Sequence, residues 1–312
     1  MNDRNMMMTR RTMLGGALAF AALGGVSAHG AADMKPGLNI GCSTVCFRKL
    51  PLREALERIR RAGYEYIETQ ATGPWCPHVD AGKDDPQKFR ELIGSFGFKG
   101  VTGIWSRHGA IIPNAKSVEG ITRTIRWAKE AGIPIVHAGD GRKPDAMSEA
   151  DAMKVLGERL AAILEVAEEC RVYLAIEPHG TYSLTADGLK KILALSSSKW
   201  LGINYDTANV HRATYVETVD GAYKWVPFGK RQDEVATLKE VADRVVHVHV
   251  KDVKGATCVA LGEGSVNVRG CIDCLKSRGY AGVLSLETEG DGEIEDMQRL
   301  IVASRRYLMR EA

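Results

Sequence analysis

From Leu38 onward, short apolar runs alternate with amphipathic segments, and each pair occupies roughly thirty residues of the chain. The apolar runs predict eight β-strands, at residues 38–43, 64–70, 100–106, 133–140, 172–180, 201–210, 245–252 and 282–290. The amphipathic segments predict eight helices, at residues 51–63, 85–97, 117–132, 149–171, 185–197, 231–244, 266–279 and 293–308. This strict alternation predicts a single domain, an α/β (β/α)8 TIM barrel that spans residues 38–312.

An open, doubly wound α/β sheet is the alternative fold. Its first strand–helix turn should carry a glycine-rich phosphate loop, and the corresponding stretch here, IGCSTVCF at residues 40–47, has none. The barrel is therefore favoured. Residues 210–231, VHRATYVETVDGAYKWVPFGKR, interrupt the alternation with an aromatic-bearing insertion after the sixth predicted strand. Long loops at that end of a barrel often cover substrates.

The first 32 residues have the order of segments that is typical of an export signal. Basic residues, among them the pair Arg10-Arg11, precede a weakly apolar run over residues 13–26, and small residues follow around Ala28. This order predicts a twin-arginine signal peptide with a short linker, residues 1–32, and export to the periplasm. An uncleaved membrane anchor is the alternative, but it needs about twenty apolar residues. The run here is shorter and contains four glycines.

The charge of the chain bears on its partners. Cleavage after Ala28 or Ala32 is expected, and removal of residues 1–28 takes away three Arg and one Asp, so that the formal net charge falls from +3 to about +1. No basic stripe remains to predict a nucleic-acid partner. We expect a small carbohydrate substrate and no membrane insertion after cleavage, and a homo-oligomer is left open.

The seven cysteines do not form a recognisable metal motif. Cys271 and Cys274 have zinc-knuckle spacing, but they lie in a predicted helix and no second such pair exists in the sequence. We therefore expect the cysteines to be small buried hydrophobic residues.

The predicted strand VVHVHVKD, residues 245–252, carries polar side chains on one face. Its valines at alternate positions face one side of the pleat, so that His247, His249 and Lys251 share the other. In a TIM barrel the apolar side of a strand packs on the helices and the other side faces the barrel interior, with the active site at the C-terminal end. We therefore expect all three side chains to point inward, with His247 one pleat deeper in a hydrogen-bonded role.

The same alternation places acidic side chains inside neighbouring strands. Glu177, Asp206 and Glu287 face inward near the ends of the predicted strands 172–180, 201–210 and 282–290. Converging carboxylates repel one another and are costly to bury, so a bound cation explains them most simply. Together with His249 they form a mostly oxygen ligand set, which suits one divalent ion: Mn²⁺, Mg²⁺ or Co²⁺, with Zn²⁺ as an alternative.

These segments resemble the xylose-isomerase-like TIM barrel family, a broad superfamily of sugar phosphate isomerases and epimerases. The resemblance runs from about Leu38 to the C-terminus, and it is carried by IEPHG, YDTAN, HVHVKD, LGEGSVNV and GYAGVLSLETEG. It implies that Glu177, Asp206, His249 and Glu287 are the family's shared metal site. It also implies that the two glutamates are catalytic, as acid and base on opposite faces of a bound sugar.

The resemblance implies a divalent-metal-dependent sugar isomerase or epimerase that acts through a metal-stabilised enediolate. Export and the lack of an arginine-rich phosphate clamp favour an unphosphorylated sugar or keto-sugar. A metal-dependent lyase or dehydratase, acting by β-elimination on a 3-keto-glycoside or an inosose-like substrate, is the alternative. An endonuclease IV-like DNA repair enzyme would need further histidines around three zinc ions and a basic surface. A non-catalytic sugar-binding barrel is the remaining alternative.

Two departures from the epimerase pattern keep elimination open. Three residues after Asp206, where those enzymes usually carry a substrate-contacting histidine, this chain has Asn209, and His211 follows two positions later. Where they carry a sugar-binding arginine after the seventh strand, this chain has Lys251 and Lys254. The Lys-Asp pair of HVHVKD is similar to that of inosose dehydratases and of lyases that act on 3-keto-glycosides.

Six residues are further candidates for substrate binding: His179, Asn209, His211, Lys251, Glu68 and Trp105. His179 follows Glu177 by two positions and faces the same way, which favours a substrate contact over a structural hydrogen bond. Lys251 either polarises a carbonyl group or pairs with Asp252 at the rim. Trp105 is either a sugar-stacking platform or a packed aromatic residue.

Overall fold

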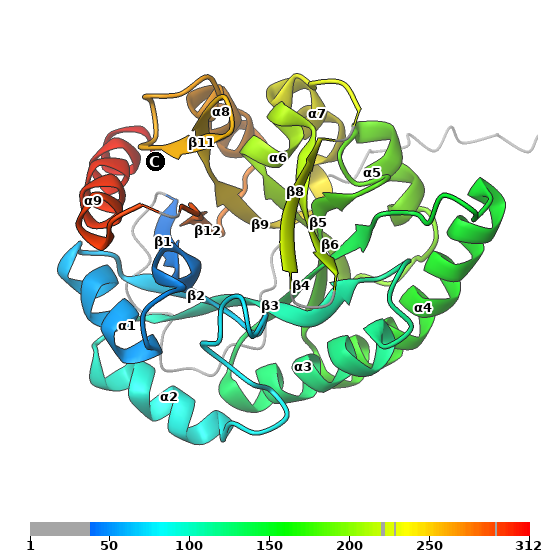
Figure 1. Ribbon diagram of the computed structural model, residues 1–312, viewed down its shortest axis with the longest axis horizontal. Helices are drawn as coiled ribbons and strands as arrows, with labels where there is room; N and C mark the ends of the chain where they lie inside the picture. The colour runs from blue at the N-terminus through cyan, green and yellow to red at the C-terminus, as the bar shows by residue number, and fades with distance from the viewer. Residues whose placement is uncertain (1–37, 220–221, 228, 291) are drawn as a thin grey trace, which may run out of the picture. The chain divides into compact units, whose positions relative to one another are not determined.

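Eight parallel strands close into a barrel in the order β1, β12, β9, β6, β5, β4, β3, β2 (Figure 1). The strands are β1 (Asn39–Ser43), β2 (Tyr66–Gln70), β3 (Gly100–Ala110), β4 (Ile135–Gly141), β5 (Tyr173–Gly180), β6 (Leu201–Asp206), β9 (Val245–Val250) and β12 (Val283–Leu286). The predicted (β/α)8 barrel is confirmed. This computed structural model describes residues 38–219, 222–227, 229–290 and 292–312. The predicted signal segment, residues 1–32, lies outside the described residues.

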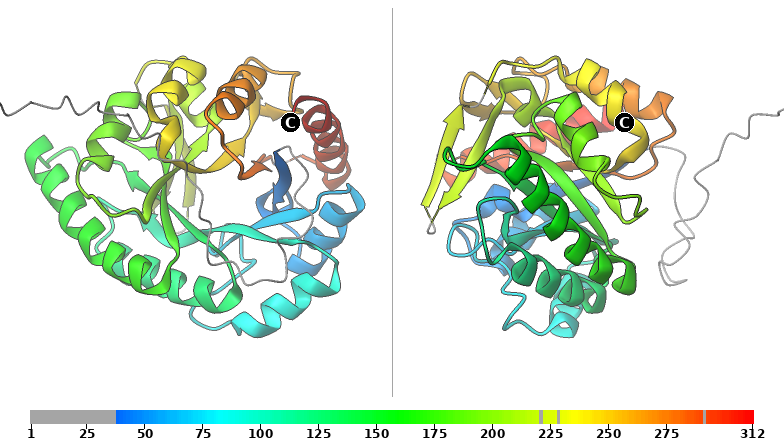
Figure 2. Two further views of the ribbon diagram at one scale, coloured as in Figure 1. Left: turned by 180° about the vertical axis from the view of Figure 1, so that it is seen from behind. Right: turned by 90° about the vertical axis from the view of Figure 1, so that its right-hand side faces the viewer.

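Helices surround the strands (Figures 1 and 2). They are α1 (Leu52–Arg61), α2 (Pro86–Ser95), α3 (Ser117–Ala131), α4 (Glu149–Cys170), α5 (Ala186–Leu193), α7 (Glu234–Val241), α8 (Val268–Ser277) and α9 (Ile294–Glu311). Each begins within three residues of a predicted helix start, because the start signals are local. Asp85 accepts hydrogen bonds from the backbone N–H groups of Gln87 and Lys88, which caps α2. After α3, Gly132 adopts a left-handed φ of 76° that ends the helix.

The core lies between the strands and the helices, where the apolar faces of both meet. In α4 the buried side chains recur at helical spacing, as Ala152, Leu156, Leu160, Ile163 and Leu164. They pack in one hydrophobic cluster with apolar strand residues such as those at 174, 203, 248 and 284. The strand side chains on the opposite face of the pleat are left to fill the barrel interior.

The strand predicted at residues 201–210 ends at Asp206, and a short helix, α6 (Thr207–Arg212), leads into the insertion predicted at residues 210–231. It continues as an antiparallel hairpin of β7 (Thr214–Val219) and β8 (Ala222–Pro227). The hairpin crosses in front of the barrel in Figure 1 and projects from one end of it in the side view of Figure 2. Shorter elements are the 3-10 helices η1 (Thr44–Phe47) and η2 (Ala242–Arg244), and a small hairpin of β10 (Asp252–Lys254) and β11 (Thr257–Val259).

The last two barrel strands in the chain are shorter than predicted. β9 ends at Val250 and β12 at Leu286, whereas the sequence predicts strands to residues 252 and 290. The backbone N–H of Glu287 donates to the carbonyl of Val250 at 3.2 Å, and pairing stops there. Lys251 and Glu287 therefore stand at the first positions of two loops at the same end of the barrel.

The cysteines match their predicted role. All seven are free thiols, and all but the half-buried Cys258 are buried. In the part of the chain that the structure describes, we find no helix with the length and hydropathy that a membrane span requires.

Candidate metal centre and active site

The barrel register brings the four predicted metal ligands together. Asp206 of β6 pairs with His249 of β9, which in turn pairs with Ser285 of β12, two residues before Glu287. Glu177 enters from β5, and a potential ligand atom of each of the four residues lies within 4.8 Å of those of the others. All four are at most 4% exposed. We call Glu177, Asp206, His249 and Glu287 the upper cluster.

The electrostatics of the upper cluster differ for its two glutamates. Burial raises the pKa of Glu177 to about 8, and the carboxylates of Glu287 and Asp206 add to this effect while His249 opposes it. Burial acts in the same direction on Glu287, but His249 and Lys251 hold the pKa of Glu287 well below its ordinary value. Protein groups alone therefore leave one of the two carboxyl groups protonated near neutral pH. A donor set of three carboxylates and one imidazole fits a divalent cation, whose charge would offset the charge of the carboxylates.

The side chains of the cluster are held in place locally. One carboxylate oxygen of Asp206, Oδ1, accepts hydrogen bonds from the N–H groups of Ala208 and Asn209 at 2.8 and 2.7 Å, and so caps α6. The other oxygen, Oδ2, lies 3.1 Å from Lys251 Nζ. His249 Nδ1 faces the cluster, 3.2 Å from Glu287 Oε2.

Lys251 is an ammonium group buried among carboxylates. It is 1% exposed, and its Nζ lies 2.7 Å from Glu287 Oε2 and 3.0 Å from Glu289 Oε1. Burial acts to lower the pKa of Lys251, but Asp206, Glu287 and Glu289 raise it well above its ordinary value. Asp252 does not pair with it: the Asp252 carboxylate accepts hydrogen bonds from the backbone N–H groups of residues 262, 264 and 266. Lys251 therefore pairs with carboxylates of the cluster rather than with Asp252 at the rim.

A layer of polar side chains lies under the upper cluster. His249 Nε2 donates to Glu68 Oε2 at 2.8 Å, and the hydroxyl of Ser285 donates to the same oxygen at 2.8 Å. Glu68 was a candidate for substrate contact, and the structure places it fully buried against His249. His247 is also buried and hydrogen-bonded, 2.9 Å from Asn204 Oδ1, as expected from its deeper position.

The remaining candidates fall into two groups. Asn209 Nδ2 donates to Glu177 Oε1 at 3.3 Å, and His179 Nδ1 lies 3.8 Å from the same oxygen. The ring of Trp105 meets His179 edge to face, with centroids 5.3 Å apart. These three residues border the upper cluster. His211 instead contacts Glu234 and Ser265, at 2.8 and 3.0 Å, so its hydrogen bonds within the described residues lead away from the four ligands.

Sequence reasoning missed one neighbour of the cluster. Gln70, at the end of β2, donates through Nε2 to Glu287 Oε1 at 3.3 Å and is fully buried. The alternation of the strand could have identified Gln70, because it follows Glu68 by two positions and so shares its face of the strand.

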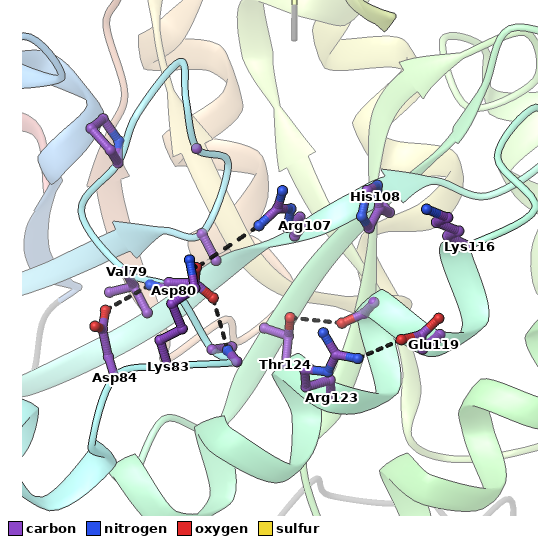
Figure 3. Close-up of a pocket in the computed structure, with 16 residues that line it drawn as sticks. Val79, Asp80, Lys83, Asp84, Arg107, His108, Lys116, Glu119, Arg123 and Thr124 are labelled. Atoms are coloured by element: carbon purple, nitrogen blue, oxygen red, sulfur yellow. Dashed lines mark hydrogen bonds and ion pairs between the residues drawn. The ribbon is translucent and has the colours of Figure 1, made fainter. Parts of the chain in front are cut away.

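A separate pocket of about 520 Å³ lies between the β2–α2 loop, the end of β3 and the start of α3 (Figure 3). It includes none of the upper-cluster residues. Its charges are largely paired within its wall: Asp80 lies 3.2 Å from Lys83 and 3.9 Å from Arg107, and Arg123 contacts Glu119 (Figure 3).

Comparison with known proteins agrees with this fold. A family model described as xylose isomerase-like TIM barrel matches residues 56–310, so the chain belongs to that family. An uncharacterised protein of Methanocaldococcus jannaschii, MJ1311, is 26% identical over 181 residues, which are 55% of this chain and 57% of that protein. An inosose dehydratase of Clostridium beijerinckii is 26% identical over 162 residues, 41% of this chain and 53% of the enzyme. The chain thus spans about half the length of these curated relatives.

Solved structures share the fold over most of both chains. A D-tagatose 3-epimerase-like protein superposes with a TM-score of 0.70 at 20% identity, covering 88% of this chain and 97% of that one. The 3-keto-D-glucoside 4-epimerase of E. coli gives 0.69 at 15% identity, with 88% and 99% covered. The IOLI protein, whose structure holds a zinc atom, gives 0.68 at 14% identity, with 88% and 98% covered.

Proposed function

We propose that this protein is a divalent-metal-dependent isomerase or epimerase that acts on an unphosphorylated sugar or keto-sugar. One observation carries the proposal: Glu177, Asp206, His249 and Glu287 are buried together, with potential ligand atoms within 4.8 Å of one another. Two of these residues are glutamates, which can act as acid and base. The names of the epimerases and of the inosose dehydratase that resemble this chain support a sugar or a related polyol as the substrate.

In the reaction that we propose, Glu287 is the base. Its ionised carboxylate takes a proton from the carbon next to a carbonyl group, and Glu177 in its protonated form returns one at another carbon or on the other face. The buried Lys251 ammonium, 2.7 Å from Glu287, neutralises charge that develops on the carbonyl oxygen. A divalent ion held by Glu177, Asp206, His249 and Glu287 would lower the pKa of the carbon acid and stabilise that negative charge. Asn209 and His179, beside Glu177, would contact the sugar hydroxyl groups.

The oxygen-rich ligand set favours Mn²⁺, Mg²⁺ or Co²⁺ in this centre. Zn²⁺ is also compatible with carboxylate and imidazole ligands, and the IOLI protein provides an example of zinc in the same fold. Metal analysis of the purified protein decides between them.

A lyase or dehydratase is the second candidate. It is favoured by the buried Lys251, which stands where the sequence pattern of epimerases has an arginine, and by the similarity to an inosose dehydratase. Proton transfer to Glu287 would then be followed by cleavage of a C–O bond and formation of a C=C bond, and Glu177 would donate its proton to the leaving oxygen. Both candidates share the first step.

The test is incubation of the metal-loaded protein in D₂O with free ketoses and 3-keto-glycosides, followed by NMR. Deuterium in a recovered or epimerised sugar indicates isomerase chemistry, whereas a released alcohol or water with a new enone indicates a lyase. We expect Glu177→Gln and Glu287→Gln to reduce either reaction by about 10²- to 10⁴-fold, because each removes an acid or base. The exposed Glu240→Gln is the matched control and should keep full activity. Unchanged turnover in both site variants would refute the assignment.

A further inference from the structure

Under the upper cluster lies a second set of buried potential ligands. It consists of Glu68 on β2, His137 on β4, and His247 and His249 on β9, and we call it the lower cluster. Each residue is at most 1% exposed, and a potential ligand atom of each lies within 4.8 Å of those of the others. The lower cluster shares His249 with the upper cluster and adds two imidazoles that the proposed function does not use.

His137 is the residue that most needs an explanation. It is fully buried, yet within the described residues neither of its ring nitrogens has a hydrogen-bond partner. Such a burial costs about 1–3 kcal/mol for each unsatisfied group. Its ring lies 4.6 Å from the ring of His247 and 5.5 Å from that of His249, centroid to centroid. The barrel also keeps space for it, because a Cβ on Gly103 would lie 2.1 Å from His137 Nε2.

The hydrogen bonds of His247 direct a lone pair into the same space. Asn204 Nδ2 lies 3.1 Å from Glu177 Oε2 and must donate to it, which orients Asn204 Oδ1 toward His247 Nδ1 at 2.9 Å. His247 therefore carries its proton on Nδ1 and leaves Nε2 as an acceptor. Nε2 lies 3.0 Å from Thr102 Oγ1, which is also 3.2 Å from the carbonyl of Ile67. A hydroxyl has a single hydrogen, so Thr102 can donate to only one of these two acceptors.

We propose that the lower cluster binds a second metal ion, a divalent transition metal of the Zn²⁺ class, through Glu68, His137, His247 and His249. The ion would satisfy His137 and the Nε2 atom of His247, and would leave Thr102 to donate to Ile67. Three imidazoles and one carboxylate are a nitrogen-rich set that suits Zn²⁺, in contrast to the oxygen-rich upper cluster.

The two sites would meet at His249. Its Nε2 lies 2.8 Å from Glu68 Oε2 and its Nδ1 lies 3.2 Å from Glu287 Oε2, so the two ring nitrogens face different clusters. His249 would offer Nε2 to the lower cluster and Nδ1 to the upper cluster once both of its ring protons are released to solvent. This second ion goes beyond the proposed function, which requires only the upper cluster.

The test is the metal content of the full chain after saturation with Zn²⁺ and gel filtration. We expect two Zn²⁺ ions per wild-type chain, one in His137→Gln and one in His247→Gln. Glu177→Gln, which weakens the upper cluster, should keep the lower ion. His108→Gln changes a histidine that belongs to neither cluster and should keep two. The visible absorption of the Co²⁺-loaded protein should lose its nitrogen-rich component in His137→Gln and retain it in Glu177→Gln.

One ion per wild-type chain would overturn the proposal, and so would two ions in both histidine variants. If the lower cluster binds a water molecule in place of a metal ion, we expect one ion per wild-type chain. If a histidine variant fails to fold, the number of ions per wild-type chain and the absorption spectrum of Co²⁺-loaded Glu177→Gln still test the second metal site. The outcomes are also separable from those for catalysis. Deuterium exchange into a sugar with one ion per chain would support the proposed function and overturn the second metal site. Two ions per chain without turnover would support the second metal site and contradict the proposed function.

Discussion

At the scale of single residues, Asp140 shows how a buried carboxyl group can organise the rim of the site. Asp140 accepts hydrogen bonds from the Tyr182 backbone N–H at 2.6 Å and from the Ser183 hydroxyl at 2.5 Å. Ser183 Oγ in turn accepts from the N–H of His179 at 2.8 Å, so Asp140 supports the end of β5, which carries a predicted substrate contact. Burial raises the pKa of Asp140 to about 6, although these hydrogen bonds act to lower it.

This shift predicts a pH dependence of stability. The folded-state pKa is above the ordinary value of 3.8, so the contribution of Asp140 is fully present below about pH 4 and is lost as pH rises through about 6. The loss amounts to at most about 3 kcal/mol, from 1.36 kcal/mol per pKa unit. We expect urea unfolding between these pH values to show a smaller fall in unfolding free energy for Asp140→Asn than for the wild type. The exposed Asp145→Asn should retain the wild-type slope, and an identical slope in Asp140→Asn would contradict the assignment.

At the scale of secondary-structure elements, the helix starts are encoded by short local motifs. Ser148 Oγ accepts from the backbone N–H of Asp151 at 3.1 Å and donates to the Asp151 carboxylate at 2.6 Å, which caps the 22-residue helix α4. The strand ends are not encoded in this way. The sequence predicts strands that continue past Val250 and Leu286, but β9 and β12 end at these residues.

The cap of α4 supports a stability prediction. Ser148→Ala removes the acceptor for the Asp151 N–H group and should lower the free energy of unfolding by about 1 kcal/mol. Ser148→Asp supplies another acceptor and should restore most of the loss. Urea unfolding of the three proteins at one pH is the measurement, and an alanine variant as stable as the wild type would show that the cap contributes nothing.

At the scale of the whole molecule, barrel closure brings carboxylates from distant parts of the chain into one buried cluster. Glu177 on β5 and Glu287 after β12 both lie against His249, at 3.4 and 3.2 Å. Such a cluster is less costly with a cation than without one.

Metal removal should therefore destabilise the folded chain. A ligand that binds only the folded state stabilises it by about 2.7 kcal/mol at one hundred times its dissociation constant. We expect chelation to lower the midpoint of thermal unfolding by several degrees, and re-addition of Mn²⁺, Mg²⁺ or Co²⁺ to restore it. Asp206→Asn, which weakens the oxygen-rich upper cluster, should reduce the response to Mg²⁺. A midpoint that is independent of metal would contradict the centre.

The sequence by itself determined the elements and the inward-facing residues. The period-two alternation of VVHVHVKD places His247 and His249 on one face, and the same rule orients Glu177, Asp206 and Glu287. Both inferences rest on local geometry, since the pleat and the helical repeat are properties of neighbouring residues. The twin-arginine signal and the periplasmic location stay predictions.

Only the tertiary structure decided which inward-facing groups meet. Strand register set the contacts of Lys251 with Glu287 and Glu289, buried Glu68 against His249, and left His137 without a hydrogen-bond partner among the described residues. Register in a closed barrel depends on all eight strands at once. No local pattern carries that information, because each contact joins residues that are distant in the chain and become neighbours only when the barrel closes.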